Sequence, residues 1–335
     1  MEIQQFIGAD LSKKTIDLAI HSTQQHVQIA NTQSGFKHLL SWIRSRRIEP
    51  REVHIIMEHT GLYSYCFEAF LSAKGIVFTK VPALAVKRSM GIIRGKTDKI
   101  DAFRIAAYRF EKKDKLQPTQ MPEPTIVELQ MLQKTRARLV SQKASLICAI
   151  KEYTNIGITP KSPIIKSQNQ VIKVLEKEIE KLEAKIDELI ETSQLKQTYN
   201  LLTSIKGVGR VVAIAMIIKT NNFSRFSNAR KFACFCGIAP FDYSSGTSIR
   251  KRSRVSHLAD KEMKCLLDLS SKTAIQHDPE LKAYYIRRTE QGKPKRSTIN
   301  IVRNKIVQRM FAVIKRQTTF IDNFLTNPEI NLVSC

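Results

Sequence analysis

The sequence predicts an α/β domain followed by long helices and a second, mostly helical domain. Three observations support this fold class. Short apolar segments with the alternation of β-strands lie within the first 81 residues. A heptad repeat of apolar residues marks the middle of the chain, and three prolines, Pro118, Pro122 and Pro124, precede it. We therefore expect domains at residues 1–117, 118–198 and 199–325 of the 335-residue chain.

The first domain is expected to open with an antiparallel meander, because tight polar turns separate three alternating segments. These strands are predicted at residues 3–11, 15–21 and 25–30. Helices are then predicted at residues 34–46, 63–73 and 98–112, with strands at residues 53–58 and 75–81 and one more helix opened by Pro82. Three meandering strands followed by alternating helices and strands is the element order of an RNase H-like fold.

Four acidic residues are candidate metal ligands and catalytic groups. Asp98 and Asp101 are three residues apart, so they share one face of the predicted helix, where they repel unless a cation or a proton intervenes. Asp10 and Glu58 each end an apolar strand segment, where α/β proteins usually place their chemistry. Mg²⁺ binds through such oxygen ligands. The alternative for the helical pair is a solvated first turn favoured by the helix dipole.

The middle region is predicted to be two helices. The first covers residues 126–153 and is basic, and prolines at 160 and 163 interrupt the pattern. The second covers residues 169–193, and its apolar residues recur in steps of three and four, as in a coiled coil. These are Ile172, Leu175, Ile179, Leu182, Ile186 and Leu189. We expect the seam to pair with another chain, and the alternative is a hairpin packed within one chain.

The last region carries a glycine turn and a run of hydroxyls and cations. Residues 205–209 followed by an apolar helix resemble a helix-hairpin-helix, in which Lys206, Gly207 and Gly209 would approach a phosphate; a purely structural turn is the alternative. A helix entered through a turn is expected at residues 223–236. Residues 240–254 have almost no apolar pattern, so we expect an exposed loop or hairpin whose cations, including Arg254, neutralise phosphates. Two cationic helices should follow, one of them at residues 297–315.

The charge of the chain points to a polyanionic partner. Lys and Arg total 55 against 30 Asp and Glu, a formal charge of +25, and nucleic acid is the commonest partner of such a protein. An anionic membrane surface is the alternative, although no apolar run has the length of a spanning helix and no secretory signal pattern is visible. Six scattered cysteines lack metal-site or disulfide spacing, so we expect reduced thiols in a cytoplasmic protein.

The order and spacing of six sequence blocks resemble those of one known family. The blocks are residues 7–10 (IGAD), 58–61 (EHTG), 96–102 (KTDKIDA), 205–209 (IKGVG), 232–240 (FACFCGIAP) and 245–250 (SGTSIR). In this order they are similar to the DEDD serine transposases of bacterial insertion sequences. These are bridge-RNA-guided recombinases whose relatives include the pilin-gene invertases. The resemblance covers most of the chain and implies a RuvC-like first domain, a coiled-coil spacer and a helical transposase domain.

The resemblance also implies roles for individual residues. The four acids of the family match Asp10, Glu58, Asp98 and Asp101, and its essential serine matches Ser245, directly before Gly246. Ser244 precedes Ser245 here, so a nucleophile one residue earlier stays an alternative. The implied partners are Mg²⁺, donor and target DNA, a bridge RNA, and further copies of the chain as a homodimer that assembles to a homotetramer. Lys96, Arg250, Lys251 and Arg252 are further candidate contacts to nucleic acid.

Three functions remain open at this point. The first is a DNA recombinase that forms a covalent phosphoserine intermediate, and the second is a metal-dependent nuclease or junction resolvase in which water attacks instead. The third is a nucleic-acid-binding protein without catalysis. The four intact acids argue against the third function. The serine-containing loop and the coiled coil argue against the second, because a simple resolvase needs neither.

Overall fold

The computed structural model describes residues 5–59, 61–89, 91, 95, 97–112, 114–245 and 249–321. Contacts between residues divide the chain into two compact units, Met1–Met121 and Pro122–Cys335. Each unit has its own hydrophobic core, so each is described by itself below.

Unit 1 is built on a five-stranded mixed sheet with the strand order β3-β2-β1-β4-β5. The strands are β1 (Gln5–Leu11), β2 (Thr15–Ile20), β3 (His26–Ala30), β4 (Val53–Glu58) and β5 (Val77–Val81). The first three are antiparallel, while β4 runs parallel to β1, and β5 parallel to β4. The helices are α1 (Gln33–Arg44), α2 (Tyr65–Ala73), α3 (Ala83–Ser89) and α4 (Asp98–Glu111), with short 3₁₀ turns at Pro50–Glu52 and Gly61–Ser64. The predicted meander and the RNase H-like element order are confirmed.

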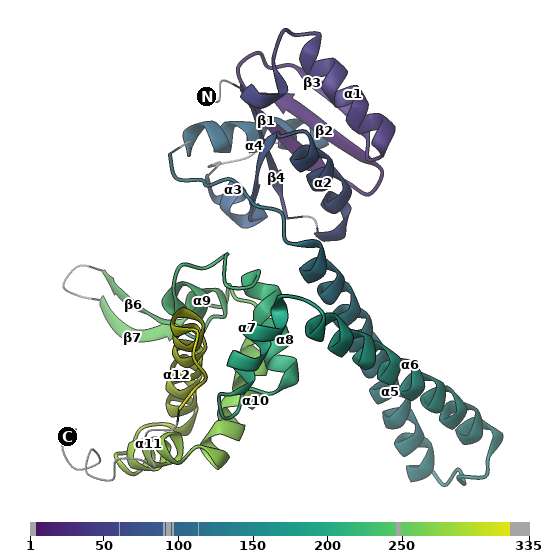
Figure 1. The fold of residues 1–335 in the computed structure, drawn as a ribbon, viewed down its shortest axis with the longest axis vertical. Helices are drawn as coiled ribbons and strands as arrows, with labels where there is room; N and C mark the ends of the chain where they lie inside the picture. Colours follow the sequence, from purple (N-terminus) through teal and green to yellow (C-terminus); the bar gives the residue numbers. More distant parts are fainter. Residues whose placement is uncertain are drawn as a thin grey trace. The chain divides into compact units, whose positions relative to one another are not determined.

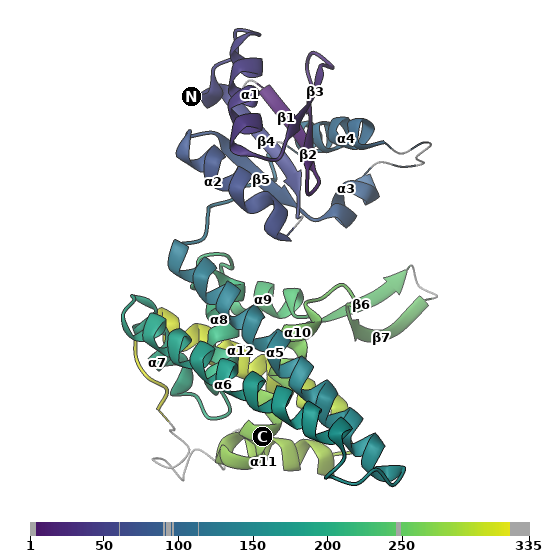
Figure 2. The same ribbon diagram turned by 90° about the vertical axis from the view of Figure 1, so that its right-hand side faces the viewer.

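The sheet separates two apolar layers, because successive residues of a strand point to opposite faces. On one face, Ile7 and Ile55 pack with Phe36 of α1 and Phe67 of α2 in the larger core. On the other face, Ile56 packs with apolar residues of α3 and α4. Figure 2 shows α1 and α2 on one side of the sheet and α4 on the other.

Helix α4 lies against β1 at Gly8. A Cβ atom at this position would be 2.0 Å from the carbonyl oxygen of Ala102 and 2.4 Å from the backbone nitrogen of Ala106. Only glycine therefore allows the helix backbone to approach the strand this closely. The contact brings the first turn of α4 to the carboxyl end of β1, where Asp10 lies two residues after Gly8.

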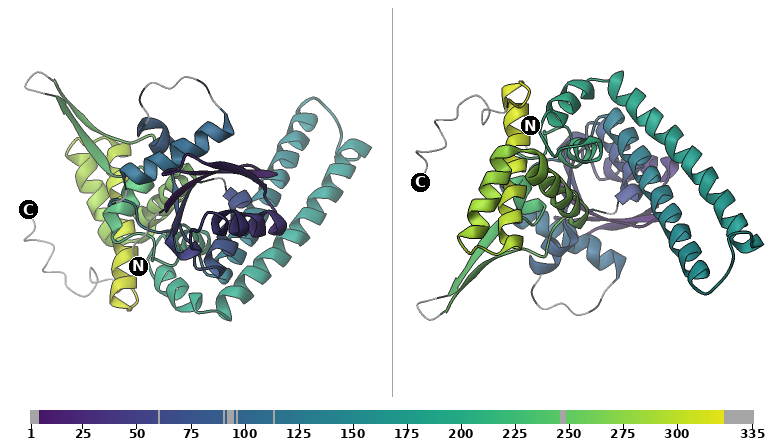
Figure 3. Two further views of the ribbon diagram at one scale, coloured as in Figure 1. Left: turned by 90° about the horizontal axis from the view of Figure 1, so that it is seen from above. Right: turned by 90° about the horizontal axis from the view of Figure 1, so that it is seen from below.

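Unit 2 begins with a helical hairpin of α5 (Pro124–Asn155) and α6 (Pro163–Glu191), which lie side by side (Figure 1 and Figure 3). Arg136 of α5 pairs with Glu183 of α6, and Lys143 Nζ lies 3.0 Å from Glu176 Oε1. Ile172, Ile179 and Ile186 of the heptad seam are buried. The alternative of a hairpin within one chain is thus the arrangement in this structure. The second helix also starts earlier than predicted, because Pro163 occupies the first helical turn, where proline is tolerated.

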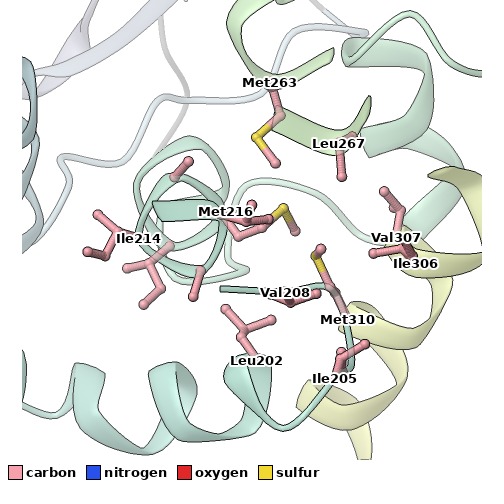
Figure 4. Close-up of a cluster of buried hydrophobic side chains, with 14 of the residues drawn as sticks. Leu202, Ile205, Val208, Ile214, Met216, Met263, Leu267, Ile306, Val307 and Met310 are labelled. Carbon is pink, nitrogen blue, oxygen red and sulfur yellow. The ribbon is translucent and has the colours of Figure 1, made fainter. Parts of the chain in front are cut away.

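The remaining helices surround a second core, which Figure 4 shows in close-up. Ile205 and Val208 of the glycine turn pack there with Met216, Met263 and Met310. The helices are α7 (Leu195–Thr203), α8 (Arg210–Thr220), α9 (Ala229–Phe235), α10 (Lys261–His277), α11 (Pro279–Glu290) and α12 (Lys295–Arg316).

Two predictions for this region are wrong. The expected turn is present, with left-handed residues Asn221 to Phe223, but the helix expected at residues 223–236 is only α9, because Asn228 caps its N-terminus. Three helices rather than two follow the hydroxyl-rich run. Asp278 ends α10 and caps the N-terminus of α11, where its side chain accepts from the Leu281 N–H at 2.9 Å. This shared cap marks the boundary between the two helices.

The hydroxyl-rich run is a two-stranded antiparallel hairpin of β6 (Pro240–Ser245) and β7 (Ile249–Val255) that projects from the helices of unit 2 (Figure 1). Phe241, Asp242, Ser244 and Arg254 are exposed on it, in agreement with the prediction of an exposed loop or hairpin. None of the helices in the described part of the chain combines the length and the apolar character needed to span a membrane.

The hairpin packing predicts unequal effects of two substitutions on α6. Ile179 is 9 % exposed against α5, whereas Val174 is 62 % exposed on the same helix. Ile179→Ala should lower the free energy of unfolding by about 2–4 kcal/mol because it leaves a cavity. Val174→Ala, the matched control, should change it by less than about 0.5 kcal/mol. Urea denaturation followed by helical circular dichroism measures both, and equal effects would contradict the packing.

Candidate functional site

The four predicted acids lie at one edge of the sheet in unit 1. Asp10 is near the end of β1, and Glu58 is the last residue of β4. The two strands are parallel, and the last pair in their ladder is Ala9 with Met57, so the two acids follow at the same edge. Asp98 and Asp101 are in the first turn of α4, which covers this face. The sequence-based placement of both pairs is therefore as expected.

Asp10 is the electrostatic centre of the group. Burial of its carboxyl, followed by the negative charges of nearby acids, raises its pKa from 3.8 to about 6; these acids are Asp98, Asp101, Glu58 and Asp17. A carboxyl with a raised pKa holds its proton unless a cation offsets the surrounding negative charge. The site thus favours either a proton or a positive ion at Asp10.

Asp98 and Asp101 lie in different environments. Asp98 has features of the solvated first turn that the sequence offered as the alternative to a metal site. Asp98 is exposed in the first turn of α4, where the helix dipole stabilises it, and the Thr97 side chain caps the helix by accepting from the Ile100 N–H. Asp101 instead accepts from Arg104 Nη1 at 2.9 Å, and Arg104 also donates to the carbonyl oxygen of Gly95 at 3.2 Å. Arg104 therefore competes with any metal ion for the Asp101 carboxylate.

The donor set fits a hard divalent cation. All four side chains offer carboxylate oxygens, and their mutual repulsion at Asp10 is the charge that an ion would relieve. Among the residues that the structure describes, no three His, Cys, Asp or Glu side chains are gathered closely enough to hold an ion. The four carboxylates are close enough for their charges to interact, but they do not form a closed coordination shell. An ion would have to draw them closer together.

A fifth acid, Asp17 of β2, was not predicted from the sequence. It pairs directly with Asp10 across the antiparallel ladder, so both side chains lie on the face covered by α4. The sequence does contain a signal for Asp17. It lies between Ile16 and Leu18 in an alternating strand, so it must point to the face opposite the apolar core.

The predicted serine lies in unit 2. Ser245 is the last residue of β6 and pairs with Ile249, while Ser244 pairs with Arg250. The structure describes the backbone but not the side chains of Ser245, Arg250, Lys251 and Arg252, whose predicted roles are thus untested. Lys96 and Gly246 lie outside the described residues.

The glycine turn has a structural explanation. Gly207 has φ +89°, and a Cβ there would be 2.6 Å from the carbonyl oxygen of Ser270 in α10. Ser270 Oγ also donates to the Gly207 carbonyl oxygen at 2.6 Å. Gly209, by contrast, is exposed at the N-terminus of α8 with open space around it. The turn therefore packs against α10 through one glycine and leaves the other accessible.

Comparisons with known proteins all point to one family of transposases. Residues 7–154 match a family model described as a transposase, the DEDD transposase of the IS110 type, and residues 199–286 match the model "Transposase IS116/IS110/IS902 family". The chain is 27 % identical over 327 residues to the pilin gene-inverting proteins of Moraxella bovis and Moraxella lacunata, covering 94 % of this chain and 97 % of each relative. It is 28 % identical over 139 residues to an uncharacterized 43.6 kDa protein of insertion element IS110 from Streptomyces coelicolor, which covers 42 % of this chain and 33 % of that protein.

The raised pKa of Asp10 predicts a pH-dependent effect of Asp10→Asn. In the metal-free protein, the folded state holds this proton up to about pH 6, whereas the unfolded state ionises near pH 3.8. Asp10 thus costs stability above pH 6 and none below pH 3.8. At pH 8 in EDTA, Asp10→Asn should stabilise unit 1 on the order of 1–2 kcal/mol, allowing for solvent screening.

Thermal unfolding measures this difference as a rise in Tm of about 3–5 °C at pH 8. At pH 4 the rise should vanish, because Asp10 is already protonated in the folded wild type. If the variant has a lower Tm than the wild type at pH 8, the ionised Asp10 carboxylate is not repelled by its acidic neighbours as we infer.

Proposed function

Because the chain belongs to the IS110/IS116/IS902 family of DEDD transposases, enzymes that carry out DNA transposition, we propose that it cuts and rejoins DNA through a covalent phosphoserine intermediate. The observation that carries this proposal is the half-buried Asp10, which lies among other carboxylates at one edge of an RNase H-like sheet. The DEDD domain implies a divalent metal, and the all-oxygen donor set favours Mg²⁺.

The acids and the serine would divide the chemistry between them. Asp10, Glu58, Asp98 and Asp101 would hold the metal, which supplies stabilisation of the entering and leaving oxygens at phosphorus. The Oγ atom of Ser245 would form a bond to phosphorus as the bond from phosphorus to a deoxyribose oxygen breaks. The serine proton would pass to a base, and the released oxygen would gain a proton. Reversal of these steps rejoins strands without ATP, because the phosphodiester energy is conserved in the intermediate.

The excess of cations in the chain supports a nucleic-acid interface. With a formal charge of +25, the chain can neutralise many phosphates. We propose that Arg250, Lys251, Arg252 and Arg254 on the hairpin contact the DNA backbone, together with Lys96 and with Lys206, Gly207 and Gly209 of the glycine turn. The family resemblance adds a bridge RNA that selects donor and target DNA by base pairing, since RNA is bound largely through shape and backbone contacts.

The three predicted segments would then have separate tasks. Residues 1–117 would be the metal-dependent catalytic domain, residues 118–198 the oligomerisation region and residues 199–325 the serine-bearing domain. Because α5 and α6 already bury their heptad seam against each other, further copies would contact the outer surfaces of this hairpin. Homodimers that assemble to a homotetramer would bring serines and acidic sites of different copies together.

The nucleophile can be identified by covalent capture of DNA. Full-length protein, its co-purified RNA and labelled donor DNA should yield a protein–DNA adduct in Mg²⁺ that resists SDS. Ser245→Ala should abolish this adduct, because no oxygen remains to attack phosphorus. Ser244→Ala, the neighbouring control, should retain it. The reverse pattern would place the nucleophile at Ser244, and free nicks without an adduct would favour the nuclease alternative.

A composite site predicts complementation between two inactive proteins. Asp10 belongs to unit 1 and Ser245 to unit 2, so one copy can supply the acids and another the serine. Asp10→Asn and Ser245→Ala should each abolish recombination of a donor and a target plasmid, whereas their co-expression should restore part of the activity. Recovery of activity requires mixed oligomers, which differently tagged copies would reveal. Mixed oligomers without recovery would contradict a shared site.

A further inference from the structure

Asp17 is an acidic group beside the four-carboxylate site that the proposed mechanism does not use. It is 4 % exposed, although an aspartate is seldom buried unless its charge is paired or hydrogen-bonded. Its cross-strand partner on β1 is Asp10, and its cross-strand partner on β3 is Gln28. Together with Glu58 on β4, these side chains form a polar row across four strands on the face that α4 covers.

Both oxygens of Asp17 are held in place. Oδ1 lies 2.7 Å from His26 Nε2, and Oδ2 accepts from Gln28 Nε2 at 3.0 Å. The His26 ring in turn lies 6.4 Å from the ring of Phe103, which follows Asp101 by two residues on α4. The orientation of the Asp17 carboxylate is therefore fixed by β3, and its main donor contacts the same helix that carries Asp98 and Asp101.

A purely structural role does not account for this placement. A core position facing α4 would be filled more stably by an apolar residue than by an aspartate that needs two donors and repels Asp10. Carboxylate oxygens have lone pairs beyond the two used by His26 and Gln28, so Asp17 can still accept hydrogen bonds from water. Mg²⁺ usually keeps several of its waters when it binds to protein.

We propose that Asp17 is a positioning residue of the metal site: held by His26 and Gln28 beside Asp10, it adds a fifth negative charge that retains a hydrated divalent ion. This inference rests on the proposed metal-dependent function. Asp17 acts through the hydration water of the ion and through Asp10, and does not itself become a ligand. Residues that support metal ligands in this way typically contribute 10- to 100-fold to metal affinity.

Direct measurement of metal binding tests the proposal without any assay of catalysis. EDTA-treated full-length protein is titrated with MnCl₂ in the absence of nucleic acid, and the free Mn²⁺ is counted by electron paramagnetic resonance. Asp17→Asn should raise the Kd by about tenfold, whereas Asp10→Asn should abolish binding at the site. Glu111→Gln, which removes an exposed acid at the far end of α4, should leave the Kd unchanged.

Two variants of the donor separate positioning from packing. His26→Leu removes the donor and should weaken Mn²⁺ binding severalfold, while His26→Gln keeps a donor and should retain most of the affinity. Circular dichroism confirms that each variant is folded. If Asp17→Asn does not fold, the contrast between the two His26 variants decides the question.

The outcomes distinguish this inference from the proposed function. A wild-type Kd in folded Asp17→Asn, or equal Kd values for the two His26 variants, would overturn the positioning role and leave the metal site intact. Complete loss of binding in Asp17→Asn would also overturn it, because that result assigns Asp17 as a direct ligand. Absence of Mn²⁺ binding in the wild type would contradict the metal site itself and, with it, this inference.

Discussion

The close approach of α4 to β1 at Gly8 is the contact on which the acidic site depends. Four like charges do not gather by mutual attraction, and the raised pKa of Asp10 records the cost of bringing them together. The backbone contact between Gly8 and Ala102 holds the first turn of α4 beside Asp10. The proximity of the acids is thus a result of helix–sheet packing, and an ion would only have to draw the carboxylates closer together.

The other end of α4 is anchored by a buried polar cluster. The guanidinium of Arg109 lies 5.3 Å from the ring centroid of Phe6, and Arg109 Nη2 lies 3.4 Å from His54 Nδ1. Burial, and then the charge of Arg109, lowers the pKa of His54 to about 4, so this imidazole is neutral near pH 7. His54 Nε2 lies 2.7 Å from Thr79 Oγ1 on β5. These contacts link this end of α4 to β4 and, through Thr79, to β5.

The sequence predicted those parts of the site that depend on local pattern. Asp10 and Glu58 were recognisable because each ends an apolar strand, and Asp98 with Asp101 because helical spacing puts them on one face. Asp17 was missed because strand register, which the local pattern does not reveal, places it opposite Asp10. The heptad of α6 correctly predicted that this helix packs against another helix, but not that the partner is α5 of the same chain. An apolar seam looks the same whether its partner lies within the chain or in another copy. The number of helices after the hydroxyl-rich run was also missed, and in the structure one residue, Asp278, both ends α10 and caps α11.

Under the proposed function, the hairpin of β6 and β7 has a consequence for the order of events. A two-stranded ribbon has few contacts to stabilise it by itself, and this one carries the cations Lys251 and Arg254 along its second strand. Phosphates bound along such a ribbon would stiffen it by neutralising its self-repulsion, so substrate would complete the geometry of the element that bears Ser245. The proposed nucleophile would then reach its reactive position only after DNA is in place. Ionic strength would accordingly affect the rate of the chemical step in the assembled complex, in addition to the affinity for DNA.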